Sequence, residues 1–190
     1  GFNTKRDAII FNGKYTVEEF RPAWDWEPLH GLDWGFSTDP TAAVRCYIHD
    51  DTLYVYKECG RVGLELDETS ETVKNAIKGV ERYVIRADSA RPESVSYCKR
   101  DGLPLIESVE KWPGSVEDGI SVMRSFKRIV IHPECKETAQ EFRLYSYKVH
   151  KQTGEVLPQI VDKNNHYIDA IRYALAPIIK GYGQGYGDLL

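Results

Sequence analysis

The chain has 190 residues, 42% of them hydrophobic and 28% charged, which suits a single domain with one sizeable core and excludes a disordered chain. Its net charge of −4 argues against a protein that coats duplex nucleic acid with an overall basic surface, although it leaves room for a local basic rim. No apolar run approaches the ~18 residues that a membrane span needs, and the first residues contain no signal-type core.

The absence of certain short motifs argues against several kinds of chemistry. The sequence has no G-x-x-x-x-G-K-[ST] phosphate loop, no G-x-S-x-G elbow and no H-E-x-x-H pair. The cysteines are scattered without a C-x-x-C pair, so we expect four reduced thiols rather than a zinc site; they are Cys46, Cys59, Cys98 and Cys135. Because the chain begins with Gly1 rather than Met, we expect it to be a processed product or an excised domain.

The first third of the chain predicts three antiparallel strands. Residues 1–28 are expected to be an approach segment, with the folded body beginning at Leu29. Residues 29–36 predict the first strand, which the turn-forming residues 37–40 end. Alternating runs at 41–49 and 52–59 then predict a hairpin around Asp50 and Asp51.

The rest of the chain changes between helical and strand periods. Strands are predicted at 83–87, 103–108 and 128–131, and helices at 67–80, 92–100, 115–126, 133–142 and from Asn164 or Asn165 to about 179. Ser115 and Asp118 have the spacing of a capping box. Residues 145–161 alternate around a Gln-Thr-Gly turn and predict a second hairpin, and the glycine-rich residues 181–190 predict a flexible tail.

A three-stranded meander followed by alternating helices and strands predicts a mixed α/β sheet. A right-handed crossover after the third strand allows the fourth strand to pair beside the first. The strand order then reverses next to the first strand, and open α/β sheets bind ligands at such switch points. Asp33 on the first strand and Asp88 at the end of the fourth are expected to meet there.

Three aspartates stand in apolar elements, where a lone carboxylate is costly to bury unless a partner or a metal compensates it. Asp33 lies in the first strand, Asp88 closes the fourth, and Asp169 borders the apolar stripe of the last helix. We interpret them as ligands of a shared cation. The structural alternatives are a turn hydrogen bond for Asp33, a helix cap or turn for Asp88, and an ion pair with Arg172 for Asp169.

His166 lies three residues before Asp169 on the same helical face, as an additional ligand or as a capping or packing histidine. Three carboxylates and an imidazole can hold two divalent ions, one to activate a water and one to stabilise a leaving oxygen. Oxygen ligands favour Mg²⁺ or Mn²⁺, and the histidine shifts the preference towards Mn²⁺.

Further acids and bases surround these candidates. Glu58 is a possible outer acid or a solvated edge residue, and Asp162 is an outer ligand or a residue placed for the helix dipole. The second hairpin interleaves basic and aromatic residues, which suits DNA binding but also a solvated ribbon; its basic candidates are Arg143, Lys148, His150, Lys151 and Lys163. A second basic rim near Asp88 consists of Arg82, Arg86, Arg91, Lys99 and Arg100.

At these positions the chain resembles the C-terminal nuclease domain of the large terminase subunit of tailed bacteriophages. The matching pieces are Gly31-Leu-Asp-Trp-Gly with Asp39-Pro-Thr-Ala, Ala87-Asp88-Ser, and Asp162-Lys-x-Asn-His166-x-x-Asp169-Ala-x-Arg-Tyr-Ala, which together span nearly all of residues 29–176. The resemblance implies an RNase H-like fold and a metal-dependent endonuclease that cuts concatemeric viral DNA during genome packaging. It also implies that Asp33, Asp88 and Asp169 are metal ligands, with His166 a further ligand or near neighbour.

The resemblance further implies partners: double-stranded DNA, an N-terminal ATPase domain preceding residues 1–28, the small terminase subunit and the portal protein, in the host cell cytoplasm rather than in the virion. The hairpin at 145–161 would lie beside the active site and gate or guide DNA. Two other readings stay open, because one fold hosts many chemistries. One is a Holliday-junction resolvase or transposase-like enzyme, and the other is a non-catalytic docking module.

Overall fold

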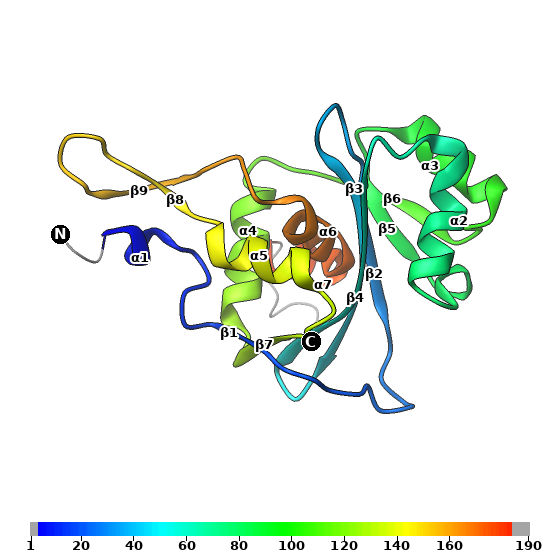
Figure 1. Cartoon of the computed structure of the whole chain (residues 1–190), viewed down its shortest axis with the longest axis horizontal. Coiled ribbons are helices and arrows are strands. Elements are labelled where there is room, and N and C mark those ends of the chain that lie inside the picture. The colour runs from blue at the N-terminus through cyan, green and yellow to red at the C-terminus, as the bar shows by residue number, and fades with distance from the viewer. Residues whose placement is uncertain (1–3, 184–190) are drawn as a thin grey trace.

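The computed structural model describes residues 4–183 (Figure 1). Its centre is a seven-stranded sheet in the order β1-β7-β4-β3-β2-β5-β6. The strands are β1 (Tyr15–Val17), β2 (Leu29–Asp33), β3 (Pro40–His49), β4 (Thr52–Val62), β5 (Ile85–Asp88), β6 (Ile106–Val109) and β7 (Arg128–Ile131). The helices are α1 (Thr4–Ala8), α2 (Leu66–Ala76), η1 (Val80–Arg82), α3 (Pro92–Asp101), α4 (Ser115–Ser125), α5 (Lys136–Leu144), α6 (His166–Ala174) and α7 (Ala176–Gly183).

The sheet has the mixed topology that the sequence predicts. β2, β3 and β4 form an antiparallel meander, whereas β5 pairs in parallel with β2 and β6 in parallel with β5. On the other side, β7 runs parallel to β4 and β1 parallel to β7. The strand order therefore reverses between β2 and β5, and the expected switch point is confirmed.

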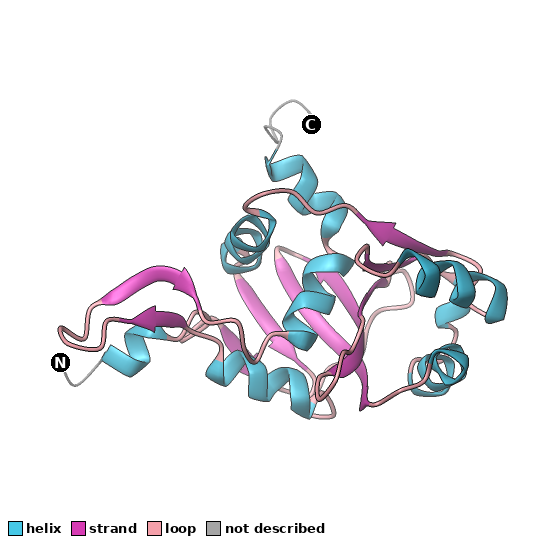
Figure 2. Cartoon of the chain, turned by 90° about the horizontal axis from the view of Figure 1, so that it is seen from above, coloured by secondary structure: helices cyan, strands magenta, loops and turns pink. Residues whose placement is uncertain are grey.

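Helices cover both faces of the sheet (Figure 2), so each face has its own apolar core. One core packs α4, α5 and α6 against the sheet, and the other packs α2 and α3 against the opposite face. Because side chains alternate along a strand, Val44 on β3 joins the first core while its neighbour Ala43 joins the second. This alternation decides which strand residues face α6.

The folded body begins earlier than Leu29. β1 pairs with β7 at the sheet edge, and Phe11 is fully buried with its ring centroid 4.5 Å from that of Phe142. The sequence does not predict β1, because a strand of three residues is too short to show an alternating pattern. Part of the expected approach segment thus belongs to the packed domain.

Several predicted boundaries differ for local reasons. The last helix is two helices that meet at Leu175, and α2 stops at Ala76 because the chain turns at Gly79, where φ is +79°. β4 continues three residues beyond the predicted end, and β6 begins three residues later than predicted. The predicted capping box is not formed, since the Asp118 carboxylate accepts a hydrogen bond from Trp112 Nε1 instead.

The predicted second hairpin is present as β8 (Tyr147–Val149) and β9 (Val156–Ile160), which project from the body beside α1 (Figure 1). All four cysteines are free and buried, as expected. None of the helices within residues 4–183 has the length and apolar character needed to cross a membrane. The predicted flexible tail lies outside the described residues from position 184 onwards.

Candidate metal centre

Asp33 and Asp88 stand next to each other at the switch point. The last paired residues of β2 and β5 are Leu32 and Ala87, and each aspartate follows directly in its strand. Both side chains are mostly buried, at 12% and 13% exposed. The sheet register thus brings together two acids that are 55 positions apart in the sequence, 88 minus 33.

Asp169 is brought to the same edge by close packing of α6 against β2. An added Cβ at Gly31 would lie 1.7 Å from the carbonyl oxygen of Ala170, so only glycine allows α6 to approach this closely. Gly31 and Asp33 are two residues apart and share one face of the strand. That face is the one on which Asp169 lies, one residue before Ala170.

The three carboxylates influence one another electrostatically. Burial, together with the charges of the other two aspartates, raises the pKa of Asp33 to about 6, against a lowering effect of His166. Burial also raises the pKa of Asp169. The phenol of Tyr173 responds to all of them, because burial first and then the charges of the three aspartates raise its pKa. These acids therefore form one negative cluster in a poorly solvated place.

Each aspartate has a basic neighbour. His166 Nδ1 lies 3.9 Å from Asp33 Oδ2, and Arg172 Nη2 lies 2.9 Å from Asp169 Oδ1, which is the ion pair considered from the sequence. Lys111 Nζ lies 2.5 Å from Asp88 Oδ1. The same Asp88 oxygen accepts the backbone N–H of Ala90 at 3.0 Å, so a turn role accompanies the buried position.

His166 bridges two acids at the mouth of the cluster. Its Nε2 lies 3.3 Å from Asp39 Oδ1, while its Nδ1 faces Asp33. These contacts raise the pKa of His166, mainly through the neighbouring Asp33 carboxylate. The sequence marks Asp39 only as a turn residue, and its place beside His166 follows from the path of the turn between β2 and β3.

Glu141 on α5 is a residue that the sequence did not single out. Its carboxylate accepts the backbone N–H groups of His166, Tyr167 and Ile168, and so it caps the start of α6. Burial raises the pKa of Glu141 to about 7, against the lowering effect of these hydrogen bonds. Helical periodicity could not reveal this residue, because the helix it caps comes from another part of the chain.

The two predicted outer acids, Glu58 and Asp162, accept hydrogen bonds from groups outside the aspartate cluster. Glu58 accepts the backbone N–H groups of Glu137 and Thr138, and so it caps α5 rather than contacting the aspartates. Asp162 accepts a hydrogen bond from Asn165 Nδ2 at 2.8 Å. Its charge contributes to the raised pKa of Asp169, after burial, which places Asp162 near the cluster but not in contact with it.

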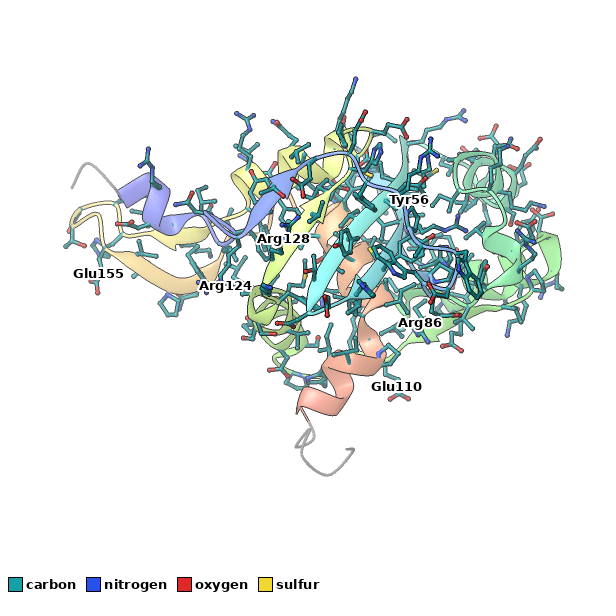
Figure 3. All side chains as sticks on the ribbon, turned by 90° about the horizontal axis from the view of Figure 1, so that it is seen from below. Tyr56, Arg86, Glu110, Arg124, Arg128 and Glu155 are labelled. Atoms are coloured by element: carbon teal, nitrogen blue, oxygen red, sulfur yellow. The ribbon has the colours of Figure 1, made fainter. Side chains whose placement is uncertain are left out.

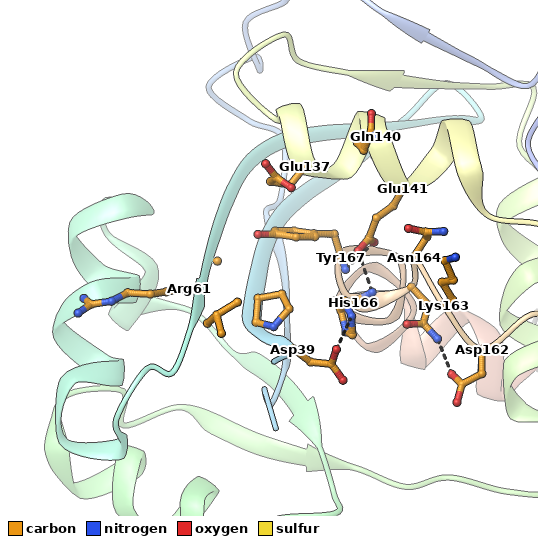
Figure 4. A pocket seen from close by; sticks show the side chains of 14 residues that line it. Asp39, Arg61, Glu137, Gln140, Glu141, Asp162, Lys163, Asn164, His166 and Tyr167 are labelled. Carbon is orange, nitrogen blue, oxygen red and sulfur yellow. Dashed lines mark hydrogen bonds and ion pairs between the residues drawn. The ribbon is translucent and has the colours of Figure 1, made fainter. Parts of the chain in front are cut away.

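A cleft of about 720 Å³ opens beside His166 (Figure 4). Asp39, His166 and Tyr167 form one wall of this cleft, and Glu137 and Glu141 on α5 form another. Lys163 and Arg61 supply positive charge, so one predicted DNA-binding residue lines the cleft.

The other predicted DNA-binding residues lie farther out. Arg143 lies in the last turn of α5 and its Nη2 donates a hydrogen bond to Gln140 Oε1, while Lys148 and Lys151 are exposed on the projecting hairpin. Of the second predicted rim, Arg86 is paired with Glu107 across β5 and β6. Of the four residues predicted to bind DNA near the hairpin, Lys163 alone lines the cleft.

The donor set suits a hard divalent cation, since three carboxylates form a buried negative cluster and an imidazole lies beside them. Within residues 4–183, however, no three acidic, histidine or cysteine side chains already stand in a ligating arrangement. Their oxygens are instead turned towards Lys111, Arg172 and His166. Ion binding at this centre would therefore require these side chains to exchange partners.

The sheet order, with an aspartate cluster at its switch point, places the domain in the RNase H-like class. Comparison with known proteins identifies the family: the sequence model described as "Terminase RNAseH like domain" matches residues 33–177. The chain belongs to this family.

Curated relatives and solved structures that resemble this chain are also large terminases. The large terminase subunit of Bacillus phage SPP1 is 34% identical over 157 residues, covering 80% of this chain and 36% of the relative. The nuclease domain of the SPP1 large terminase, solved with bound Mn, superposes with a TM-score of 0.77 at 31% identity, covering 87% of this chain and 97% of that one. The P22 large terminase nuclease domain shares the fold, with a TM-score of 0.69 at 17% identity and 87% of each chain covered. The chain thus spans about a third of the length of the curated relative.

Proposed function

We propose that this domain is a metal-dependent DNA endonuclease that cuts concatemeric viral DNA during genome packaging. The observation that carries the proposal is the meeting of Asp33, Asp88 and Asp169 at the switch point of a terminase RNase H-like sheet. The Mn bound in the SPP1 nuclease domain, at 31% identity, supports the choice of metal chemistry.

The chain's own groups have separate tasks in this mechanism. Asp33, Asp88 and Asp169 would hold Mg²⁺ or Mn²⁺, and His166 would be an additional ligand or hold Asp33 in place. Two bound ions would supply an activated water and stabilise the leaving 3′ oxygen of the scissile phosphodiester. The mostly buried position of Asp33 and Asp88 limits competing water at the ligands.

The surroundings of the domain are part of the proposal. Double-stranded DNA is the substrate. Lys163 in the cleft would contact its phosphates, as would the basic residues near the hairpin, Arg143, Lys148 and Lys151. The SPP1 and P22 proteins are large terminases, and we infer that this chain likewise works with an ATPase domain preceding it, with the small terminase subunit and with the portal. The site of action is the host cell cytoplasm.

The decisive test is plasmid nicking in Mn²⁺ or Mg²⁺ with Asp33→Asn, Asp88→Asn and Asp169→Asn. We expect each substitution to lower the cleavage rate at least about 100-fold, because Asn keeps the side-chain shape but removes the charge that holds the ions. Asp25→Asn, at an exposed aspartate, is the matched control and should cleave normally. Circular dichroism and thermal melting check that each variant is folded.

Cleavage that persists in all three variants, or that needs no metal, would refute the proposal. A strong preference for four-way junctions over linear and supercoiled duplex would instead support a resolvase. A domain that binds DNA or protein without cutting would support a docking module.

A further inference from the structure

The loop between β6 and α4 brings a lysine to the candidate metal centre. Lys111 follows two residues after β6 ends at Val109, at the edge where β5 ends in Asp88. Its Nζ lies 2.5 Å from Asp88 Oδ1. Lys111 is thus the immediate charge partner of an aspartate that is proposed to bind metal.

The loop is fixed on both sides of this lysine. Val109 pairs with Asp88 in the sheet, and Trp112 packs against the core that contains α4 and α6. Trp112 Nε1 also donates a 2.7 Å hydrogen bond to Asp118 Oδ2 on α4. The backbone of Lys111 is therefore held close to Asp88, whatever its side chain contacts.

The ammonium group, in contrast, is free to change partners. The side chain of Lys111 is 44% exposed, whereas that of Arg172, the partner of Asp169, is 7% exposed. Arg172 is fixed by two hydrogen bonds to Asp169 from its Nε and Nη2. Lys111 carries a compact charge on a flexible four-carbon stem, and it can leave Asp88 without opening the core.

Lys111 occupies Asp88 Oδ1, so a divalent ion that takes this oxygen competes with the ammonium group, and repulsion between the two cations favours its departure. The displaced group has three N–H donors and remains beside the ions' ligands. A phosphodiester at the same centre offers unpaired, negatively charged oxygens, which are good acceptors for a lysine.

We propose that Lys111 is a mobile cation of the active site: it holds Asp88 in the absence of metal and moves to a phosphate oxygen of the bound DNA strand once a divalent ion takes Asp88. This inference rests on the nuclease function proposed above. Lys111 stays protonated throughout and makes or breaks no covalent bond.

The proposal predicts effects of opposite sign for Lys111→Met, which keeps most of the side-chain volume and removes the charge. Without DNA, Mn²⁺ should bind about 2- to 5-fold more tightly, the range expected from losing a partly exposed ion pair. At saturating Mn²⁺, the single-turnover cleavage rate should fall about 10- to 100-fold, because a donor to the reacting phosphate is lost. If Lys111 only stabilised the fold, Lys111→Met would instead lower both the Mn²⁺ affinity and the cleavage rate.

The experiment combines isothermal titration calorimetry with MnCl₂ alone and single-turnover nicking of supercoiled plasmid. Lys111→Arg should keep wild-type Mn²⁺ affinity and much of the rate, since it restores the charge. Lys127→Met is the control, because Lys127 is an exposed lysine directly before β7. This variant should match wild type in both measurements.

Unchanged or weaker Mn²⁺ binding by Lys111→Met would overturn the exchange at Asp88, and an unchanged cleavage rate at saturating metal would overturn the phosphate contact. The failure of the nuclease function itself has a different signature, namely a wild-type domain that binds Mn²⁺ and does not cut DNA. The calorimetry tests the exchange at Asp88 even then, because it requires no DNA.

Discussion

His30 is a buried histidine whose partners keep it neutral. It is 1% exposed on β2, and Arg45 Nε donates a 2.8 Å hydrogen bond to its Nε2. A nitrogen that accepts this bond cannot also carry a proton. Burial, and then the charge of Arg45, lower the pKa of His30 to about 3 from 6.5.

This residue should make the domain sensitive to acid. Between pH 6.5 and about 3 the unfolded chain binds a proton at His30 that the folded chain does not, so the free energy of unfolding falls as the pH drops. We expect this group to contribute a slope of about 1.4 kcal/mol per pH unit below pH 6. Urea unfolding at pH 7.5, 6.5 and 5.5 measures it.

His30→Gln supplies the comparison, because the Gln amide oxygen can accept the bond from Arg45 and does not titrate. The slope between pH 6.5 and 5.5 should become shallower in this variant, whatever its absolute stability. His49→Gln, at an exposed histidine, should leave the slope as in wild type. Equal slopes for His30→Gln and wild type would show that His30 does not determine the acid sensitivity.

Individual site residues differ in how far sequence can reveal them. Asp33, Asp88 and Asp169 stand out because an acid is costly in an apolar element, and the register of β2 and β5 brings the first two together as expected. Lys111 and Glu141 do not stand out, because each looks like an ordinary surface residue of a loop or helix. Their importance arises only from contacts across the fold.

Among the elements, α5 and α6 are linked by one carboxylate. The first N–H groups of α6 have no partner within that helix, and Glu141 on α5 accepts three of them. Since α6 carries His166 and Asp169, this cap positions part of the candidate metal centre.

Glu141→Ala should therefore destabilise the domain by about 2–3 kcal/mol, because it leaves buried donors of α6 unsatisfied. Mn²⁺ affinity should fall as well, since the first turn of α6 carries His166. Glu137→Ala removes an exposed acid from the same helix and should cost less than about 0.5 kcal/mol. Chemical denaturation of the two variants side by side checks this, and equal losses would mean that the cap does not hold α6.

At the level of elements, the sequence predicts the meander, the crossover and the second hairpin, because these have clear periods and turn residues. It does not predict β1, which has three residues, or the break at Leu175, where the apolar pattern continues through the end of α6. Patterns identify elements that are long and regular, whereas short edge strands and helix breaks depend on tertiary packing.

For the whole molecule, the hairpin of β8 and β9 is the most prominent projection. Figure 3 shows Glu155 near its tip, well separated from Arg86 and Glu110 at the other side of the domain. The hairpin therefore extends the molecule away from the sheet, beyond the cleft beside His166. In the proposed nuclease, the tip of this hairpin would contact DNA away from the aspartate cluster.

Lys148→Ala combined with Lys151→Ala should weaken DNA binding and reduce the slope of log K against log salt by up to about 2, one unit for each lost phosphate contact. The cleavage rate of fully bound DNA should change little. Lys78→Ala with Lys127→Ala removes the same charge from other exposed positions. Fluorescence anisotropy over a series of salt concentrations measures the slopes, and an unchanged slope would remove the hairpin from the binding surface.

The order of the three acids along the chain has a consequence during translation. Asp33 in β2 is made before Asp169 in α6, and Gly31 lets that helix seat directly on β2 only after it exists. A nascent or prematurely terminated polypeptide that lacks α6 has two of the acids and no third. The three-aspartate centre therefore forms only once α6 has been made and packed against β2.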